Sequence, residues 1–405
     1  MSITKLLQAF YTFIALRWLR LTGALWILYL LHVGWTLWQV GIAEAAFHAV
    51  SFLTAVPTGI FADRVGRRRS LLLGLLIGVL APPLEYLLAP HGWVAGACAL
   101  GFSALGWSFI GGADQALLHD LSRRLPEGSR AFARLYGRMD AIALLSSALS
   151  APLGGWLAFT LGWRYAYFGQ AFLTLLAILP VLTLPVGEGE RAPATVHVPA
   201  EVPGLRQAWA TVRKTPGLLG LVLFGALLGI AATSNHLYGQ STLVAKGLTV
   251  FGATAVIGGA SLLAALASAL THRLNLKRAG PAMRRGALAL AVLIAAVGSA
   301  SGILAPVSYA LSDGVDGGID VLYATELNRA APEALRATIV SVPDALFSLG
   351  MIVLFPLEGW AMGRFGLPPL YLVLALMLAL ATPLVGRGRG RRSGTGAGPG
   401  MVTPP

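Results

Sequence analysis

The sequence has little cysteine and little charge. Cys98 is the only cysteine among 405 residues, which excludes an internal disulfide and a metal site built from several cysteines. Only 12% of the residues are charged, against about 25% in soluble domains. The chain contains no Gly-rich loop ending in Lys-Ser/Thr, no nucleophile elbow and no His-Glu-x-x-His zinc motif. These absences argue against a nucleotide-driven pump and against an enzyme, and no cofactor or metal is expected.

Long apolar runs dominate what is present. Hydrophobic residues make up 56% of the sequence, and the mean hydropathy is +0.73. About 20 apolar residues in a helix cross the hydrocarbon core of a bilayer. The net charge of +13 comes from basic residues in short segments between the runs, so membrane topology explains it and nucleic-acid binding is not expected. The sequence therefore predicts an all-α integral membrane protein.

Twelve apolar runs can be counted, six on each side of a polar segment that contains several prolines. The predicted spans are Tyr11–Val33, Leu37–Phe61, Ser70–Leu88, Trp93–Leu118, Asp140–Thr160, Tyr165–Leu184, 217–238, 249–270, 286–304, 306–327, 337–360 and 369–385. They predict a six-helix bundle at 1–184, a cytoplasmic linker at 185–215 with one short surface helix, a second six-helix bundle at 216–386 and a disordered tail at 387–405.

The basic residues also predict the orientation. Lys and Arg gather on the cytoplasmic side of membrane proteins. Of the 30 basic residues, only Arg164, Lys246 and Arg364 fall on the outer side when both termini are placed inside. The sequence therefore predicts that both termini are cytoplasmic.

The segment Gly59–Arg69 lies between the second and third runs. Its arginines alone would suit any cytoplasmic turn, but the spacing of glycine, aspartate and arginine is more specific. It resembles the loop between helices 2 and 3 of the major facilitator superfamily, G-x-L-A-D-R-x-G-R-[KR], with Phe61 in place of the usual Leu. The matching residues are Gly59, Ala62, Asp63, Arg64, Gly66, Arg67 and Arg68.

This resemblance implies twelve transmembrane helices in two pseudo-symmetric six-helix bundles, with transport by alternating access. It also implies that Asp63 lies against the inner end of the eleventh helix, and that the arginines meet acids at the inner ends of the fourth and fifth. Asp120 and Asp140 are the candidates for those acids. Such contacts would hold the two bundles together on the inner side when the carrier opens outward.

The two halves of the chain repeat one another weakly. Gly111–Asp114 recurs 206 residues later as Gly317–Asp320, and Gly155-Trp156 recurs 204 residues later as Gly359-Trp360. An ordered series of matches indicates two homologous bundles in the same orientation. Further matches at these two offsets pair Asp120 with Glu326 and Asp140 with Asp344.

Residues 151–155 resemble in part the Gly-rich element G-P-x-x-G-G in helix 5 of drug/proton antiporters. Pro152, Gly154 and Gly155 match, whereas Ala151 replaces the first glycine. The resemblance implies export of a compound in exchange for protons. Small residues here also suit close packing between membrane helices, which is the alternative explanation.

Carboxylates inside the spans are the candidates for binding protons or substrate. Asp313, Asp316 and Asp320 lie at i, i+3 and i+7, which places them on one helical stripe within about 60°. Three neighbouring carboxylates cannot all stay ionised in hydrocarbon. Asp114 and Asp320, near helix ends, suit pairing with cytoplasmic arginines better, and Asp344 is a further candidate.

Other polar groups in the spans leave alternatives open. Glu44 either faces a cavity and binds a proton or cation, or pairs with His48 one turn later. Arg17 and Arg20 lie in the inner half of the first span, where they either extend to the cytoplasmic surface or face the cavity. His236 is predicted to lie near the outer surface.

The sequence thus predicts a monomeric secondary transporter of the inner (plasma) membrane that moves a small molecule by alternating access, coupled to protons. Because acids outnumber bases in the expected cavity, export of a hydrophobic or cationic compound is the first hypothesis. Uptake or exchange of an anionic or polar metabolite is the alternative, which gains weight if Arg17 or Arg20 faces the cavity. A receptor or scaffold without transport, or an intramembrane enzyme suggested only by His119-Asp120, would belong to other classes.

Overall fold

The computed structural model describes residues 2–125, 129–184, 203–215, 217–271, 279–332 and 335–385, which form helices joined by short turns. The linker contains a helix at Pro203–Lys214 (α9), where the sequence predicts a short helix. Linker residues 185–202 and the predicted tail lie outside the described residues. The helices are α1 Ile3–Trp18, α2 Trp26–His32, α3 Leu37–Val65, α4 Arg67–Leu88, η1 Ala89–His91, α5 Trp93–Ile110, α6 Ala113–Arg123, α7 Ser129–Thr160, α8 Trp163–Thr183, α9 Pro203–Lys214, α10 Leu218–Ala245, α11 Val250–Thr271, α12 Ala279–Ser299, α13 Leu304–Ala330, α14 Arg336–Phe365, α15 Leu367–Ala381 and η4 Thr382–Leu384.

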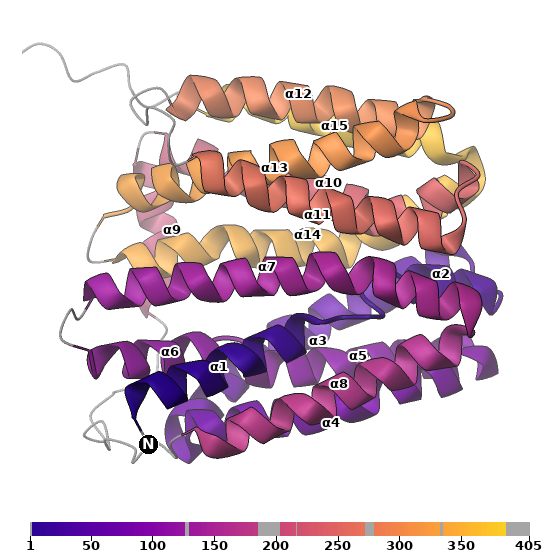
Figure 1. The fold of residues 1–405 in the computed structure, drawn as a ribbon. Helices are drawn as coiled ribbons and strands as arrows, with labels where there is room; N and C mark the ends of the chain where they lie inside the picture. Colours follow the sequence, from indigo (N-terminus) through magenta and orange to yellow (C-terminus); the bar gives the residue numbers. More distant parts are fainter. Residues whose placement is uncertain are drawn as a thin grey trace, which may run out of the picture.

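The helices form two bundles that lie side by side, α1–α8 in one and α10–α15 in the other (Figure 1). Each bundle has its own apolar core. Phe10, Phe13 and Leu71 are buried in the first, and Phe224 and Leu374 in the second. The predicted all-α fold of two six-helix bundles is confirmed.

Ten helical segments of the described chain are long and apolar enough to cross a membrane. The two other predicted spans differ from these for physical reasons. The first span is interrupted, so that α1 has only 16 residues and α2 only 7, each short of the roughly 20 that a bilayer requires. The helix α13 is long enough at 27 residues, but three aspartates lower its hydropathy.

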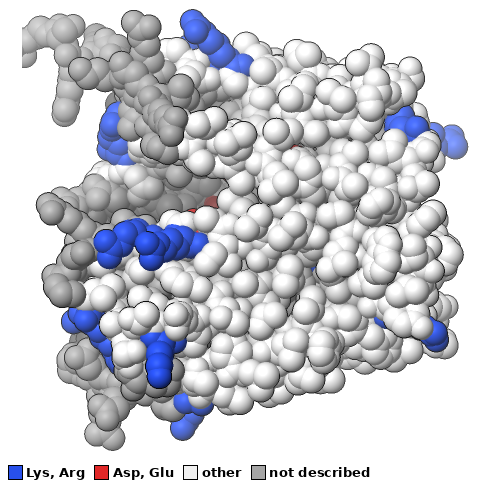
Figure 2. Space-filling model, in the orientation of Figure 1, with Lys and Arg blue, Asp and Glu red and all other residues white. Residues whose placement is uncertain are grey.

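The two ends of the molecule differ in charge. The basic end holds the N-terminus of α1 and the Gly66 turn between α3 and α4, and the far end holds the turns at Gly92, Gly162, Gly247 and Gly366. Most of the visible Lys and Arg side chains gather at the basic end, on the left of Figure 2. The charge distribution predicted from the sequence is therefore present in three dimensions.

The two bundles meet closely near the far end, along α3 with α14 and α7 with α11. Glycines allow this approach. A Cβ atom on Gly41 would lie 2.7 Å from the Pro356 Cα atom, and one on Gly155 would lie 1.8 Å from the Thr254 Oγ1 atom. We call this contact the far-end seam, because it brings backbone against backbone and closes the bundle at that end.

The sequence repeat is reflected unevenly in the structure. Gly155 and Gly359, which are equivalent in the repeat, both pack across the far-end seam. By contrast, Gly112 has a φ of +78° and interrupts the helix between α5 and α6, whereas its equivalent Gly318 continues α13 and packs near Thr271 of α11. Equivalent positions thus serve different local structures in the two halves.

Gly66 sits at the turn that joins α3 to α4. Its φ of +111° lies in the region that favours glycine over every other residue. Nothing lies within 4 Å of a Cβ atom built on Gly59, the other glycine that matches the family motif. The turn geometry therefore accounts for Gly66, and the role of Gly59 stays a prediction.

Substituting Gly41→Ala should open the far-end seam, because the added methyl group would overlap the backbone at Pro356. Gly363→Ala in α14 is the matched control, since nothing lies within 4 Å of its added Cβ atom. The measurement is the rate at which a membrane-impermeant thiol reagent, applied from the far-end side, reacts with Thr22→Cys in a Cys98→Ser background. Thr22 lines a cavity inside the molecule, between the far-end seam and the basic end. A faster reaction is therefore expected with Gly41→Ala alone, and equal rates for Gly41→Ala and Gly363→Ala would contradict the role of the seam.

Candidate functional site

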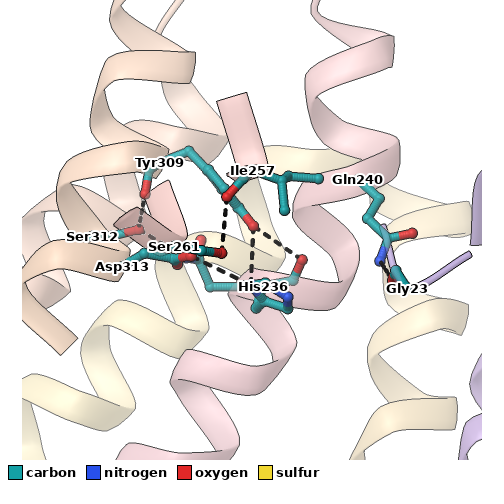
Figure 3. A network of polar contacts seen from close by, with 9 residues as sticks. Gly23, His236, Gln240, Ile257, Ser261, Tyr309, Ser312 and Asp313 are labelled. Carbon is teal, nitrogen blue, oxygen red and sulfur yellow. Dashed lines mark hydrogen bonds and ion pairs between the residues drawn. The ribbon is translucent and has the colours of Figure 1, made fainter. Parts of the chain in front are cut away.

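The first span is interrupted in the interior of the bundle. Residues 19–25 between α1 and α2 are not α-helical, and Arg20, Thr22 and Gly23 from this break line a cavity. Gln240 of the other bundle donates a hydrogen bond from Nε2 to the Gly23 carbonyl oxygen at 3.1 Å (Figure 3). Non-helical backbone at membrane depth is tolerated only where it is buried in protein or lines a water-filled cavity. The break therefore marks the position of a site.

The cavity beside the break has a volume of about 370 Å³ and lies mainly in the N-terminal bundle. We call it the arginine cavity. Its polar and aromatic lining residues are Arg17, Arg20, Thr22, Trp26, Glu44, Phe47, Glu85, Ser103, Trp107, Gln170, Thr174 and His236. Charged groups of both signs thus share one space, and His236 reaches it from the C-terminal bundle.

Arg17 and Arg20 both face the arginine cavity, so the structure decides between the two positions that the sequence left open. Each guanidinium carbon lies 4.5 Å from a ring centre of Trp107, which is a cation–π distance. Arg17 also forms a buried ion pair with Asp114, with 3.7 Å between Nη1 and Oδ2. The Arg20 side chain makes no ion pair and no hydrogen bond with any residue that the structure describes.

Two carboxylates of the N-terminal bundle lie near Arg20. Glu44 lines the cavity and also pairs with His48, with 3.5 Å between Oε1 and Nε2, so the two positions considered for it are compatible. Its binding of a proton or cation stays a prediction. Glu85 of α4 is buried and lies close to both Arg20 and Ser103. The sequence analysis missed Glu85, although it is the one carboxylate in the third apolar run and could have been noticed as such.

A second cavity, of about 330 Å³, lies in the C-terminal bundle, and we call it the acidic cavity. Asp313, Asp316 and Asp320 lie together on its α13 wall. The Oδ1 atom of Asp316 is buried and has no hydrogen-bond partner among the residues described. The walls from α7, α10 and α11 are uncharged apart from His236, and consist of Leu144, Ala232, Thr233, His236, Ser261, Ala264 and Ser268.

His236 lines both cavities. Its Nδ1 atom lies 3.4 Å from Asp313 Oδ2 and 3.2 Å from Tyr309 Oη (Figure 3). The side chain is 41% accessible, as expected for a group that faces open space. The prediction that His236 lies near the outer surface is wrong, because α10 continues to Ala245 and leaves His236 about 13 Å from the helix end.

The Gly59–Arg69 turn lies at the basic end, where two of its arginines bind neighbouring helices. Arg67 forms an ion pair with Asp120 of α6 and donates a hydrogen bond to the Ala116 carbonyl oxygen. Arg68 donates to the Leu182 carbonyl oxygen of α8 at 2.6 Å. These contacts tie α4 to other helices of the same bundle.

Other predicted residues of this end take no part in such contacts. The side chains of Asp63 and Arg64 are exposed and make no ion pair or hydrogen bond within the described part of the chain. Asp140 forms no ion pair with an arginine of the turn among these residues. Asp320 and Asp344 are both exposed. Asp320 faces the acidic cavity.

The predicted packing residues lie in the far half of α7. A Cβ atom on Gly154 would lie 1.9 Å from the Leu21 carbonyl oxygen of the break, and one on Gly258 of α11 would lie 2.8 Å from Pro152 Cδ. Together with Gly155 at the far-end seam, these residues let α7 approach both the break and the other bundle. Their contacts are of the kind that small residues permit between membrane helices.

Comparison with known proteins gives one family and several similar folds. The family model described as Major Facilitator Superfamily matches residues 7–342, and no curated protein matches the chain. A mutant of the nucleoside transporter NupG has a TM-score of 0.78 at 14% identity, covering 95% of this chain and 100% of that chain. A D-xylose-proton symporter has 0.71 at 14% identity, covering 96% and 97%. The E. coli Fucose:proton symporter FucP has 0.60 at 15% identity, covering 95% and 97%.

Removing the charge of Asp114 should destabilise the protein more than the same change at Asp120. Asp114→Asn would leave Arg17 unpaired in a buried site, and breaking a buried ion pair from one side costs about 3–5 kcal/mol. Asp120→Asn affects the pair with Arg67, which is partly exposed, and about 0–1 kcal/mol is expected.

Thermal unfolding of the purified protein in detergent measures this difference. A double variant, Arg17→Met with Asp114→Leu, removes both charges and should recover part of the stability lost in Asp114→Asn. Equal melting temperatures for the two single variants would show that Arg17 does not depend on Asp114.

Proposed function

Because the chain belongs to the Major Facilitator Superfamily, with residues 7–342 matching its family model, we propose that it is a secondary transporter that takes up a small anionic metabolite together with protons. The observation that carries this proposal is Arg20, a cation on the wall of the arginine cavity whose side chain forms no ion pair within the described part of the chain, although Glu44 and Glu85 lie near it. The basic end would then face the cytoplasm.

An unpaired arginine at this depth needs a physical reason. A charged side chain inside the membrane costs at least about 2.5 kcal/mol unless a partner, water or ligand compensates it. The guanidinium group presents five donors in a planar fork that matches carboxylate and phosphate oxygens. The Arg20 guanidinium group lies over the Trp107 ring, which orients it, and faces the open space of the cavity. An anionic group of the substrate is the partner that best completes this arrangement.

This proposal takes the place of the first hypothesis from the sequence, export of a hydrophobic or cationic compound. The arginine cavity, at about 370 Å³, is near the lower limit of the roughly 300–1,000 Å³ usual for ligand pockets, and its guanidinium groups repel a cation. The partial match at Pro152, Gly154 and Gly155 has an explanation in helix packing. The comparisons offer no support for the drug/proton antiporter branch.

The names of two similar structures fit the proposed direction of coupling. One is a D-xylose-proton symporter and the other a Fucose:proton symporter, and a symporter moves substrate and proton the same way. The likeness concerns the fold, so the substrates of those proteins are not carried over. The protons of this chain we assign to the acidic cavity, where Asp316 has a buried oxygen without a hydrogen-bond partner among the described residues.

We infer from the two ends of the molecule that this conformation is closed on the outer side of the membrane. We place the basic end in the cytoplasm, with both termini on that side of the inner (plasma) membrane, because Lys and Arg gather there. Packing at the far-end seam then closes the outer side, and acidic side chains are visible in a hollow toward the basic end (Figure 2). When the carrier opens outward, Asp63 would reach the N-terminal end of α14, where the helix dipole attracts a carboxylate.

Arg20→Gln should lower anion uptake by roughly 10-fold or more, because a hydrogen bond to a charged group contributes about 1.5–3 kcal/mol. Full-length protein in liposomes with an inward proton gradient would be tested with labelled lactate, succinate and aspartate. Arg164→Gln is the matched control, since Arg164 is exposed at the far end and contacts Tyr165. Equal uptake by the two variants would refute the anion site.

Accumulation of the same anions should rise as the outside pH is lowered at constant inside pH, since protons then drive the substrate inward. Collapsing the gradient with a protonophore should stop accumulation and leave exchange of labelled for unlabelled anion intact. Uptake that ignores the gradient would contradict proton coupling. Binding without any flux would favour a receptor, and gradient-driven movement of an organic cation such as ethidium, with no anion transported, would restore the export hypothesis.

A further inference from the structure

We propose that His236 couples proton binding to anion binding, as a positioning residue whose charge depends on whether the Arg20 site is occupied. The proposal rests on the anion site proposed for Arg20. It concerns a contact between the two bundles: His236 belongs to α10 of the C-terminal bundle, whereas Arg20 belongs to the break in the first span.

The position of His236 is the first step of the argument. It is the only residue among those described that lines both the arginine cavity and the acidic cavity. Figure 3 shows the Tyr309 hydroxyl and the Asp313 carboxylate in contact with its ring, and Gln240, one turn later on α10, donating to the Gly23 carbonyl oxygen of the break. Any change in the charge of His236 is therefore felt in both cavities.

The groups that face His236 differ in charge. On α13, the Asp313 carboxylate and the Tyr309 hydroxyl contact its Nδ1 atom. From the break, Arg20 lines the same arginine cavity as His236, and its guanidinium carries the same charge as an imidazolium ion. The walls that α7 and α11 supply to the acidic cavity carry no charged group. Further along the two cavities lie Asp316 and Asp320 on one side and Arg17, Glu44 and Glu85 on the other.

Asp313 and Arg20 therefore act on a proton at His236 in opposite directions. The carboxylate stabilises the imidazolium ion, and the guanidinium group destabilises it. An anion bound to Arg20 compensates that guanidinium charge, so it favours protonation of His236. By linkage the effect is reciprocal, and a proton on His236 favours anion binding at Arg20 to the same extent. Substrate and proton would then load together, as symport requires.

The helix α13 gives that proton a path. Asp316 and Asp320 follow Asp313 at successive turns toward the basic end, and Asp320 is exposed there. The carboxylates thus lead from the partly buried contact between His236 and Asp313 to an exposed position nearer the basic end. Asp313 would exchange the proton with His236, and Asp316 and Asp320 would pass it onward.

The electrostatic link can be measured without any transported substrate. In the full-length protein labelled with ¹⁵N-histidine, the seven histidines would be titrated by NMR in detergent, and His236→Gln would assign the His236 signal. Arg20→Gln should move the His236 titration midpoint upward by roughly one pH unit, because a like charge is removed. Arg20→Lys keeps the charge and should stay near the wild type, and Asp313→Asn should move the midpoint downward.

Two controls keep the result specific. His32 packs on the Trp163 ring at 5.3 Å and lines neither cavity, so its titration should not move in any variant. Arg20→Met keeps an apolar contact with Trp107 and serves as a second neutral variant if Arg20→Gln does not fold. A His236 midpoint that is the same in the wild type and in a folded neutral variant would overturn the proposal.

This outcome can be told apart from a failure of the proposed function. A shifted midpoint with no anion uptake would leave the link between Arg20 and His236 standing and would refute the substrate class. Anion uptake with an unshifted midpoint would refute only the role of His236. A His32 titration curve that is the same in the wild type and in every variant would exclude a general change in the protein.

Discussion

Hydrocarbon offers no partner to a charged group, and this constraint shapes the whole molecule. Each ionised side chain inside the bundle needs another side chain, water, a proton or a ligand. The structure meets this need by gathering such groups around two cavities and leaving large apolar side chains on the outside, such as Val292 and Leu380. Arg17 finds its partner in Asp114, whereas Arg20 and Asp316 do not find theirs in the described chain.

The two bundles divide the charge between them. The N-terminal bundle holds the guanidinium groups of the arginine cavity together with Glu44 and Glu85, and the C-terminal bundle holds the aspartates of α13. A substrate that bridges the bundles would therefore meet both arginines and carboxylates on the N-terminal side, and carboxylates with His236 on the C-terminal side. The break in the first span lies at this boundary, where the Gly23 carbonyl oxygen accepts a hydrogen bond from Gln240 of the C-terminal bundle.

The spans could be predicted because an apolar run is a property of neighbouring residues alone. The same holds for the stripe of Asp313, Asp316 and Asp320, whose spacing on a helix is known without any tertiary contact. The sequence alone could not show that the side chains of Arg17 and Arg20 face the cavity. Their orientation depends on contacts with Trp107 of α5 and on a helix break at residues 19–25, which contain no proline that would predict it. His236 was misplaced because the end of α10 was set seven residues early, at 238 instead of Ala245.

The far-end seam has a mechanical consequence. Glycines there bring two pairs of helices into close contact, so the two bundles can rotate relative to each other about the seam. The helix α7 runs from Ser129 to Thr160, and at 1.5 Å per residue its part between Gly155 and Ser129 is about 39 Å long. A rotation of about 10° at the seam would displace the Ser129 end by roughly 7 Å. Small adjustments among these glycines can therefore produce a large displacement at the basic end of the molecule.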